Sequence, residues 1–192
     1  MPPCAWPRLA AHQIALQVAA ILFMIPFGIS LAATVRVGHA VGRDDPVAAR
    51  RAGFGAIALG AVFMTATTAI IVALRHDIPL LFIGDQTDAG GTASLAATLL
   101  LVGATFFVSD GVQGIAAGAL RGFNDTRVPM VLAGVSFWLI GLPCAYGLAF
   151  ALGLGAVGIW IGFSIAVGTF AALLVWRFHR LSKDGWRPLS AV

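Results

Sequence analysis

The stretch that decides the fold is the segment 128–176, which reads VPMVLAGVSFWLIGLPCAYGLAFALGLGAVGIWIGFSIAVGTFAALLVW and holds 49 residues without a charge. A transmembrane helix needs about 20 mostly apolar residues, because the hydrocarbon core of a bilayer is about 30 Å thick. A single helix of this length would measure about 73 Å at 1.5 Å per residue, so the segment must turn back on itself. The glycine-rich sequence at 153–158 marks the expected turn. The segment therefore predicts two spans, 129–150 and 156–176.

Three further runs upstream are equally poor in charge. They cover residues 9–35, 52–74 and 89–120, and only Asp110 interrupts the third run. Because each run is long enough to cross a bilayer once, they predict spans at 11–35, 53–74 and 92–119.

The composition supports the same fold class. The chain is 59% hydrophobic and 10% charged, whereas a typical soluble domain is about 25% charged. So few polar side chains cannot cover the surface of a soluble enzyme. We therefore expect residues 1–192 to form a single all-α domain, an integral membrane helical bundle of about five transmembrane helices.

The cationic side chains predict how this bundle is oriented. Ten Lys and Arg lie in segments that share one side: Arg36, Arg43, Arg50, Arg51, Arg121, Arg127, Arg177, Arg180, Lys183 and Arg187. The opposite side holds Arg8 and Arg75. Because cytoplasmic loops carry the excess of Lys and Arg, we expect the N-terminus outside and the C-terminus in the cytoplasm. The cations behind the net charge of +4 are then expected to contact anionic lipid headgroups. We therefore expect no nucleic-acid partner.

Asp110 is the only charged residue inside an expected span. It lies ten residues before Leu120, which is about 15 Å along a helix and therefore deep in the hydrocarbon. A carboxyl group at that depth costs at least a few kcal/mol and normally faces the bundle interior or a water-filled cavity. Two interpretations stay open. Asp110 binds and releases a proton or a small cation, or it is a protonated residue that hydrogen-bonds to a neighbouring helix for structure alone.

Motifs for catalysis or metal binding are not visible in the sequence. Ser109, Asp110 and the four distant His compose no nucleophile and base at membrane depth, and no zinc-binding spacing occurs. We therefore expect no enzymatic activity and no cofactor.

Two stretches of the chain resemble a known transporter family. The first is AAHQIALQVAAILFMIPFGISLAATVRVGHAVGRDD at 10–45, followed by AARRAG, and the second is SDGVQGIAAGALRGFNDTRVPM at 109–130. Together they resemble the C-terminal lobe of the multidrug and toxic compound extrusion (MATE) transporters, from about Arg8 to Arg180. By this resemblance the five spans are helices eight to twelve of twelve, and the N-terminal lobe and helix seven are absent.

The resemblance implies a multi-pass protein of a bacterial inner membrane that exports drugs or organic cations in exchange for sodium ions or protons. Asp110 matches the cation-coupling carboxyl group, although one carboxyl group alone is a poor sodium site. Candidate residues for the cavity lining are Pro26, Phe106, Phe107 and Gln113. Matching loop residues, which we expect to fix the architecture, are Arg36, Gly38, Gly42, Arg121, Gly122, Asp125 and Thr126.

Two functions from different classes follow. In the first, the chain is part of a multidrug efflux antiporter that works by alternating access and is inactive without the missing lobe or a partner chain. In the second, the chain is a non-transporting membrane scaffold or assembly subunit, in which Asp110 only holds helices together.

Overall fold

The structure is a computed structural model that describes residues 5–78 and 89–183. In these residues the regular secondary structure is helical throughout, without strands. The long helices are α1 (Ala5–Gly42), α2 (Pro46–Ala73), α4 (Ala89–Gly122) and α7 (Gly155–Lys183). Between α4 and α7, four shorter segments follow one another end to end: α5 (Arg127–Gly134), η1 (Val135–Gly141), α6 (Leu142–Tyr146) and η2 (Gly147–Ala151). The prediction of an all-α fold is confirmed.

The helices have the length and apolar character that crossing a membrane requires. Four segments meet both criteria among the described residues: Leu16–Gly42, Pro46–Ala73, Arg127–Ala151 and Val157–Lys183. The remaining expected span, 92–119, corresponds to α4. Its 34 residues also exceed the length of about 20 residues that crossing a bilayer requires. Each helix continues past its predicted span, chiefly toward charged residues, so that α1 reaches Gly42 rather than ending at Val35. Of the residues expected in loops, Asp125 and Thr126 lie in the α4–α5 turn. The others are helical: Arg36, Gly38, Gly42, Arg121 and Gly122.

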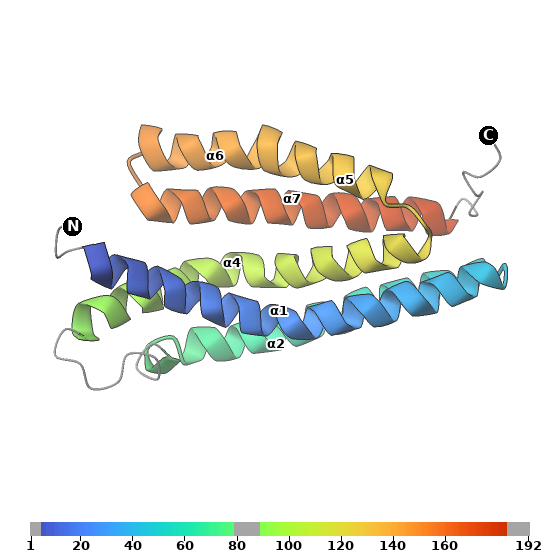
Figure 1. The fold of residues 1–192 in the computed structure, drawn as a ribbon, viewed down its shortest axis with the longest axis horizontal. Coiled ribbons are helices and arrows are strands. Elements are labelled where there is room, and N and C mark those ends of the chain that lie inside the picture. Colours follow the sequence, from blue (N-terminus) through green and yellow to red (C-terminus); the bar gives the residue numbers. More distant parts are fainter. Residues whose placement is uncertain (1–4, 79–88, 184–192) are drawn as a thin grey trace.

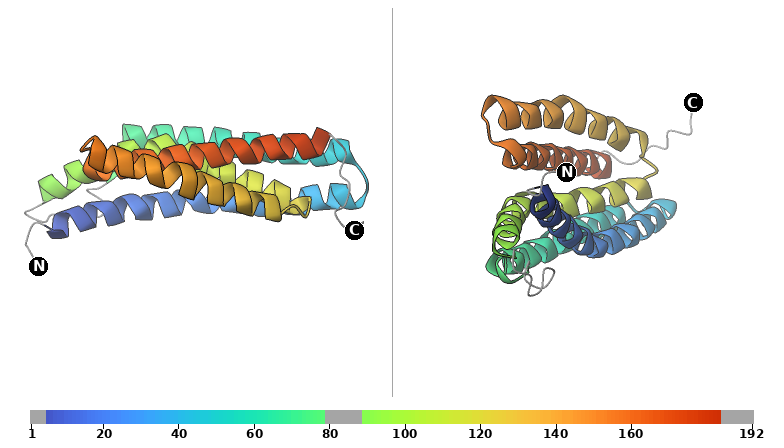
Figure 2. Two further views of the ribbon diagram at one scale, coloured as in Figure 1. Left: turned by 90° about the horizontal axis from the view of Figure 1, so that it is seen from above. Right: turned by 60° about the vertical axis from the view of Figure 1, so that its left-hand side comes forward.

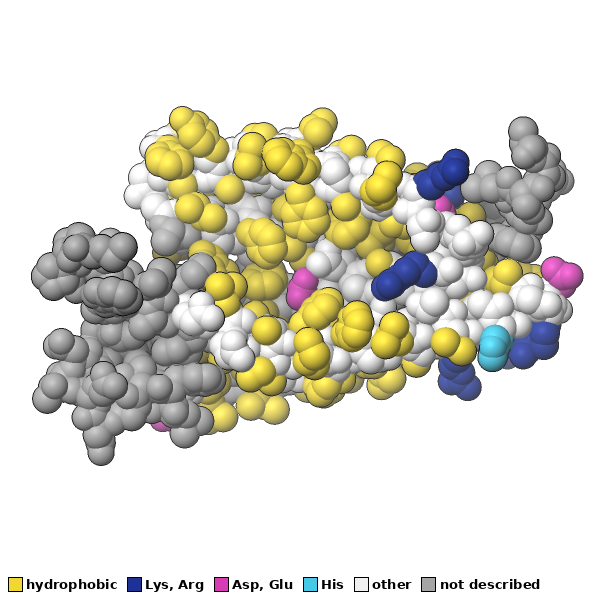
Figure 3. Space-filling view, viewed as in Figure 1, with side chains coloured by type: hydrophobic (Ala, Val, Ile, Leu, Met, Phe, Trp, Pro, Cys, Tyr) yellow, Lys and Arg dark blue, Asp and Glu magenta, His cyan; other side chains and the backbone are white. Residues whose placement is uncertain are grey.

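The long helices run side by side along the long axis of the molecule (Figures 1 and 2). α4 lies between α1 and α2 on one side and α7 on the other. The four short segments from α5 to η2, residues 127–151, are together called the α5–η2 rod, and this rod packs on the outside of α7. The α1–α2 turn, the α4–α5 turn and the end of α7 all lie at one end of the bundle (Figure 1). Cationic side chains gather at this end (Figure 3), as the charge pattern predicts; that this end faces the cytoplasm stays a prediction.

Small residues let α1 and α4 approach closely. Gly114, Gly118 and Gly122 recur every four residues on one face of α4, and Ser30 and Thr34 of α1 lie against that face. The Ser30 hydroxyl donates to the Gly114 carbonyl at 2.7 Å, and the Thr34 hydroxyl donates to the Gly118 carbonyl at 2.8 Å. Contacts of this kind hold helices together in lipid, where apolar side chains gain little by leaving one apolar medium for another.

Two buried clusters of apolar side chains fill the bundle on either side of its middle. The first includes Met64, Phe107 and Trp160, and the second includes Ile115 and Phe178. Along α4 the fully buried members of the first cluster end at Phe107, and those of the second begin at Ile115. The intervening turns of α4, residues 108–114, contain Asp110.

Pro26 and Pro143, which lie in the middle of spans, mark departures from a straight α-helix. α1 bends near its middle (Figure 1), where Pro26 removes a backbone donor from the helix. The fourth span contains the π-helical segments η1 and η2, and in η1 the Leu142 N–H bonds to the Phe137 carbonyl five residues back. Pro143 follows directly. The chain then turns back between Ala151 and Gly155, where Gly153 adopts a φ of +68° that suits glycine.

Candidate functional site

Asp110 lies in the interior of α4, far from either end of the helix. Twelve residues separate it from Gly122, the last residue of α4, which is about 18 Å along the axis. Among the acidic residues that the structure describes, it alone is inside a long helix. Figure 3 shows an acidic side chain in a hollow in the middle of one face, bordered by hydrophobic side chains. The side chain of Asp110 is half-buried.

Gln113 forms a hydrogen-bonded pair with this carboxyl group. It follows one helical turn later, and its side-chain Nε2 donates to Asp110 Oδ1 at 2.7 Å. The amide oxygen Oε1 of Gln113 is buried and has no hydrogen-bond partner among the described residues. Buried polar atoms normally have such a partner, because leaving one unpaired costs about 1–3 kcal/mol. The pair therefore offers two oxygens, the second carboxyl oxygen of Asp110 and Gln113 Oε1, to a proton donor or a cation.

The proline bend of α1 packs against the same turn of α4. A Cβ atom at Gly111 would lie 3.4 Å from Pro26 Cγ and 2.5 Å from Met64 Cγ. One turn further along, a Cβ atom at Gly114 would lie 3.3 Å from the ring of Phe23. The buried Pro26 side chain is thus seated beside the residue that follows Asp110, and the absence of a side chain at Gly111 leaves room for Met64.

The aromatic residues that precede Asp110 are placed differently. Phe106 and Phe107 are 6% and 3% exposed, and their ring centroids are 5.0 Å apart. Phe106 also stacks on Trp160 and Phe163 of α7, with ring centroids 5.7 and 5.5 Å away. In this structure both rings pack inside the first cluster. A role for them in lining a substrate cavity stays a prediction.

Some of the expected architectural residues make contacts between helices. A Cβ atom at Gly122 would lie 2.7 Å from Val37 Cβ, and one at Gly38 would lie 3.7 Å from the Gly122 carbonyl oxygen. Arg121 Nη2 donates to the Ser30 hydroxyl at 3.3 Å. These contacts fix the cationic end of α4 against α1.

Asp125 ties the α4–α5 turn to α7. Its carboxylate is 6% exposed, and its Oδ2 accepts from Arg177 Nε at 2.8 Å. Arg36, Gly42 and Thr126 are exposed; a Cβ atom at Gly42 would meet nothing within 4 Å, and Thr126 caps α5 without a side-chain hydrogen bond. Their architectural role stays a prediction.

Sequence reasoning missed three partners that the fold supplies. Ser30 and Thr34 bond across to the glycine face of α4, and Arg177 pairs with Asp125. The four-residue spacing of Ser30 and Thr34 matches that of the glycines and was the available signal. No signal in the sequence pairs Arg177 with Asp125, because 52 residues separate them.

A metal centre built from protein side chains is not found in the described ranges 5–78 and 89–183. No group of three His, Cys, Asp or Glu residues there comes close enough to hold a metal ion. Hard cations such as sodium take several oxygen ligands, and the Asp110–Gln113 pair offers two. These residues alone are therefore an incomplete sodium site.

Comparisons with known proteins give a consistent set of relatives. A family model described as MatE matches residues 7–147. A probable multidrug resistance protein NorM of Rhodopseudomonas palustris is 61% identical over 176 residues, which are 92% of this chain and 37% of that protein. A multidrug resistance protein NorM of Burkholderia vietnamiensis is 48% identical and is covered to 37% of its length. This chain thus spans a little over a third of the curated relatives that it matches.

A solved structure shows the same fold. The crystal structure of the eukaryotic MATE transporter AtDTX14 matches with a TM-score of 0.78 and 23% identity, covering 96% of this chain and 42% of that one. The family and the relatives are membrane transporters rather than enzymes. The expectations of a multi-pass membrane protein without enzymatic activity are therefore confirmed.

Proposed function

Because the chain belongs to the MatE family, we propose that it forms part of a multidrug efflux antiporter of the bacterial inner membrane. It supplies helices of one lobe and acts together with the segments that complete its relatives. The transported molecules are drugs or organic cations, and the coupling ion is a proton or sodium. The substrate class follows from the names of the relatives, which are multidrug resistance proteins.

The observation that carries this proposal is the Asp110–Gln113 pair. A carboxyl group within a long apolar helix is costly and is retained where it has a function. Here it is half-buried, bonded to one amide group and accompanied by an amide oxygen without a partner. Binding a proton or a cation removes the charge of Asp110 and satisfies the unpaired oxygen, so the loaded site is less costly to bury than the empty one.

The position of Pro26 suggests how loading is coupled to movement. Pro26 packs beside Gly111, so a change in hydration or charge at Asp110 acts on the turn against which the bend of α1 is seated. In alternating access one bundle rocks against the other around a site near the bilayer midplane. α1 can take part because its backbone hydrogen bonding is already interrupted at the bend.

Whether the coupling ion is a proton or sodium depends on the number of oxygen ligands that the site offers. A proton needs only the carboxyl group of Asp110 and an acceptor, and both are present in the pair. A sodium ion would need additional oxygens from segments that complete the transporter. We therefore propose a proton as the ion that this chain binds by itself.

The test is D110N in efflux-deficient bacteria, with D77N as the matched control. Asp77 is an exposed acid near the end of α2, so D77N removes the same charge outside the bundle. The chain is expressed with the complementary N-terminal part of the Rhodopseudomonas palustris relative, and ethidium efflux is driven by a pH gradient or by a sodium gradient. We expect D110N to abolish gradient-driven efflux and D77N to leave it unchanged.

Three outcomes would contradict the proposal or a part of it. Unchanged efflux in D110N would remove this carboxyl group from coupling. Absence of efflux in every combination, with normal membrane assembly of the chain, would favour the scaffold function instead. Efflux driven by sodium alone would overturn the assignment of the proton while leaving the transporter in place.

A further inference from the structure

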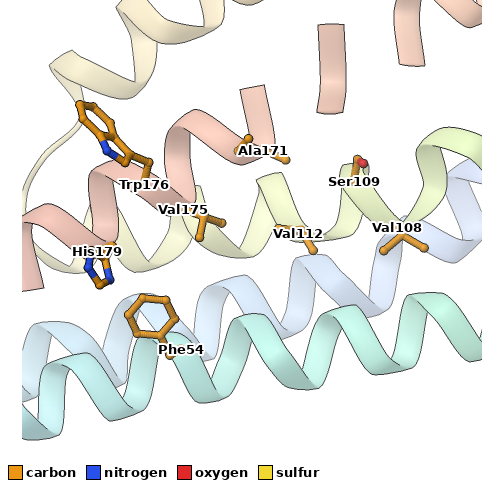
Figure 4. Close-up of a pocket in the computed structure, with 9 residues that line it drawn as sticks. Phe54, Val108, Ser109, Val112, Ala171, Val175, Trp176 and His179 are labelled. Atoms are coloured by element: carbon orange, nitrogen blue, oxygen red, sulfur yellow. The ribbon is translucent and has the colours of Figure 1, made fainter. Parts of the chain in front are cut away.

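A groove opens on the flank of the bundle between α2, α4 and α7 (Figure 4). Its volume is about 540 Å³, and its walls include Phe54 of α2, Val112 of α4 and Val175 of α7. The helices that form it are of membrane-spanning length and composition. Val108, Val112 and Ser109 line one end of the groove, and aromatic side chains together with His179 line the other (Figure 4).

A second hollow, of about 450 Å³, adjoins the aromatic end of the groove. The two share Phe54 as a wall, and the second hollow is lined by Arg50, Arg51 and Lys183. These cations lie at the end of the bundle where Lys and Arg gather. The apolar groove therefore shares a wall with a cationic hollow near the end of the bundle where Lys and Arg gather.

Two arginines stack on aromatic rings of the groove wall, and of these Arg50 also lines the second hollow. The guanidinium carbon of Arg50 lies 5.3 Å from the ring centroid of Phe54, and that of Arg180 lies 4.7 Å from the ring centroid of Trp176. Both rings also line the groove. Stacking on an aromatic face orients a guanidinium group while leaving its N–H donors free to bind an anion.

The cations of this surface have no carboxylate partner among the described residues, where the ion pair is Asp125 with Arg177. Asp45 precedes Arg50 by five residues and caps α2 by accepting from the Ala48 N–H at 2.9 Å. Asp184 follows Lys183 in the sequence and lies outside the described residues, so these two acids are outnumbered by the four cations Arg50, Arg51, Arg180 and Lys183. The surface therefore keeps an excess of positive charge that an anion can neutralise.

We propose that this surface binds an anionic phospholipid, with an acyl chain in the groove and the phosphate in the cationic hollow. The shape of this surface matches that of a phospholipid, because its apolar groove lies along the helices and its charged hollow lies at their end. The charge selects an anionic headgroup, since basic clusters at the cytoplasmic surface attract acidic lipid. Arg50 and Arg51, which line the hollow, then bind the phosphate through charge-assisted hydrogen bonds.

The test measures contact between lipid and Trp176, whose side chain is 52% exposed. The full chain is placed in phosphatidylcholine nanodiscs that contain a minor fraction of brominated phosphatidylglycerol or brominated phosphatidylcholine. Bromine quenches a tryptophan that it touches, and subtracting the signal of W176F isolates Trp176. We expect phosphatidylglycerol to quench at a roughly thirtyfold lower mole fraction than phosphatidylcholine, the preference that two arginine contacts supply.

Matched variants locate the binding. R50Q/R51Q should abolish the preference for phosphatidylglycerol, whereas R43Q/R127Q removes two exposed cations outside the groove and should keep it. R51Q/K183Q serves in place of the first variant if that protein does not fold by circular dichroism. A172F places a ring in the groove and should reduce quenching by both lipids.

Three results would overturn the proposal. Equal quenching by the two lipids would show that charge does not select the headgroup. Absence of quenching by either lipid would show that protein covers the groove. A preference that survives both R50Q/R51Q and R51Q/K183Q would place the phosphate elsewhere.

Discussion

Replacing Gly118 by alanine tests whether the glycine face of α4 sets the spacing of the bundle. The added Cβ atom would collide with the Ser30 hydroxyl and would lie 2.5 Å from the Ser30 carbonyl oxygen. Because the second contact is with backbone, a rotamer change cannot relieve it, and α1 must move away. That movement stretches the hydrogen bonds of 2.7 and 2.8 Å that Ser30 and Thr34 donate to α4.

The expected loss of stability is about 2 kcal/mol. Two hydrogen bonds within a membrane contribute about 0.6 kcal/mol each, and overpacking adds about 1–3 kcal/mol. Alanine recovers about 1 kcal/mol because it is a better helix former than glycine. The measurement is the free energy of unfolding in mixed micelles of dodecylmaltoside and SDS, followed by circular dichroism.

The matched control for this variant is G55A in α2. A Cβ atom at Gly55 would meet nothing within 4 Å, so only the gain in helix propensity should appear. If G118A and G55A unfold within about 0.5 kcal/mol of each other, a shift the size of ordinary surface substitutions, then the glycine face does not set the distance between α1 and α4.

Three further variants test other parts of the site. R177Q leaves the carboxylate of Asp125 buried without its partner and should lower the free energy of unfolding by about 3 kcal/mol in the same titration; a change below 1 kcal/mol would mean that water replaces the arginine. Q113L removes the amide that bonds to Asp110 and should weaken binding of the coupling ion about tenfold, as loss of one charge-assisted hydrogen bond does, measured by isothermal titration; unaltered affinity would exclude Gln113 from the site. P26A restores a backbone donor and should slow efflux without weakening ion binding, so an unchanged efflux rate would refute a moving bend in α1.

Each long uncharged run of the sequence corresponds to one or two long helical segments of the structure, because crossing a bilayer requires about 20 apolar residues in a row. The sequence predicts the ends poorly: α1 continues to Gly42, since charged residues remain helical after they leave the hydrocarbon. Pro143 signals a departure from the α-helix, yet only the backbone of η1 shows that the departure is π-helical. In each case local sequence sets a tendency and the packing of neighbouring helices decides the geometry.

The candidate site divides in the same way. Asp110 can be found from sequence because it is the one charge within an otherwise uncharged span. The unpaired oxygen of Gln113 could not be predicted, because it depends on how one side chain is turned between packed helices. The contact of Pro26 beside Gly111 could not be predicted either. It depends on the relative position of α1 and α4, which residues distant in sequence determine.

The α5–η2 rod packs chiefly on α7, and the short turn from Ala151 to Gly155 joins the two. This arrangement has a consequence for biogenesis. A helix whose one substantial neighbour is synthesised after it cannot dock when it first leaves the ribosome. We therefore expect the translocon to release the rod and α7 into the bilayer as a hairpin, after the earlier helices have assembled around α4.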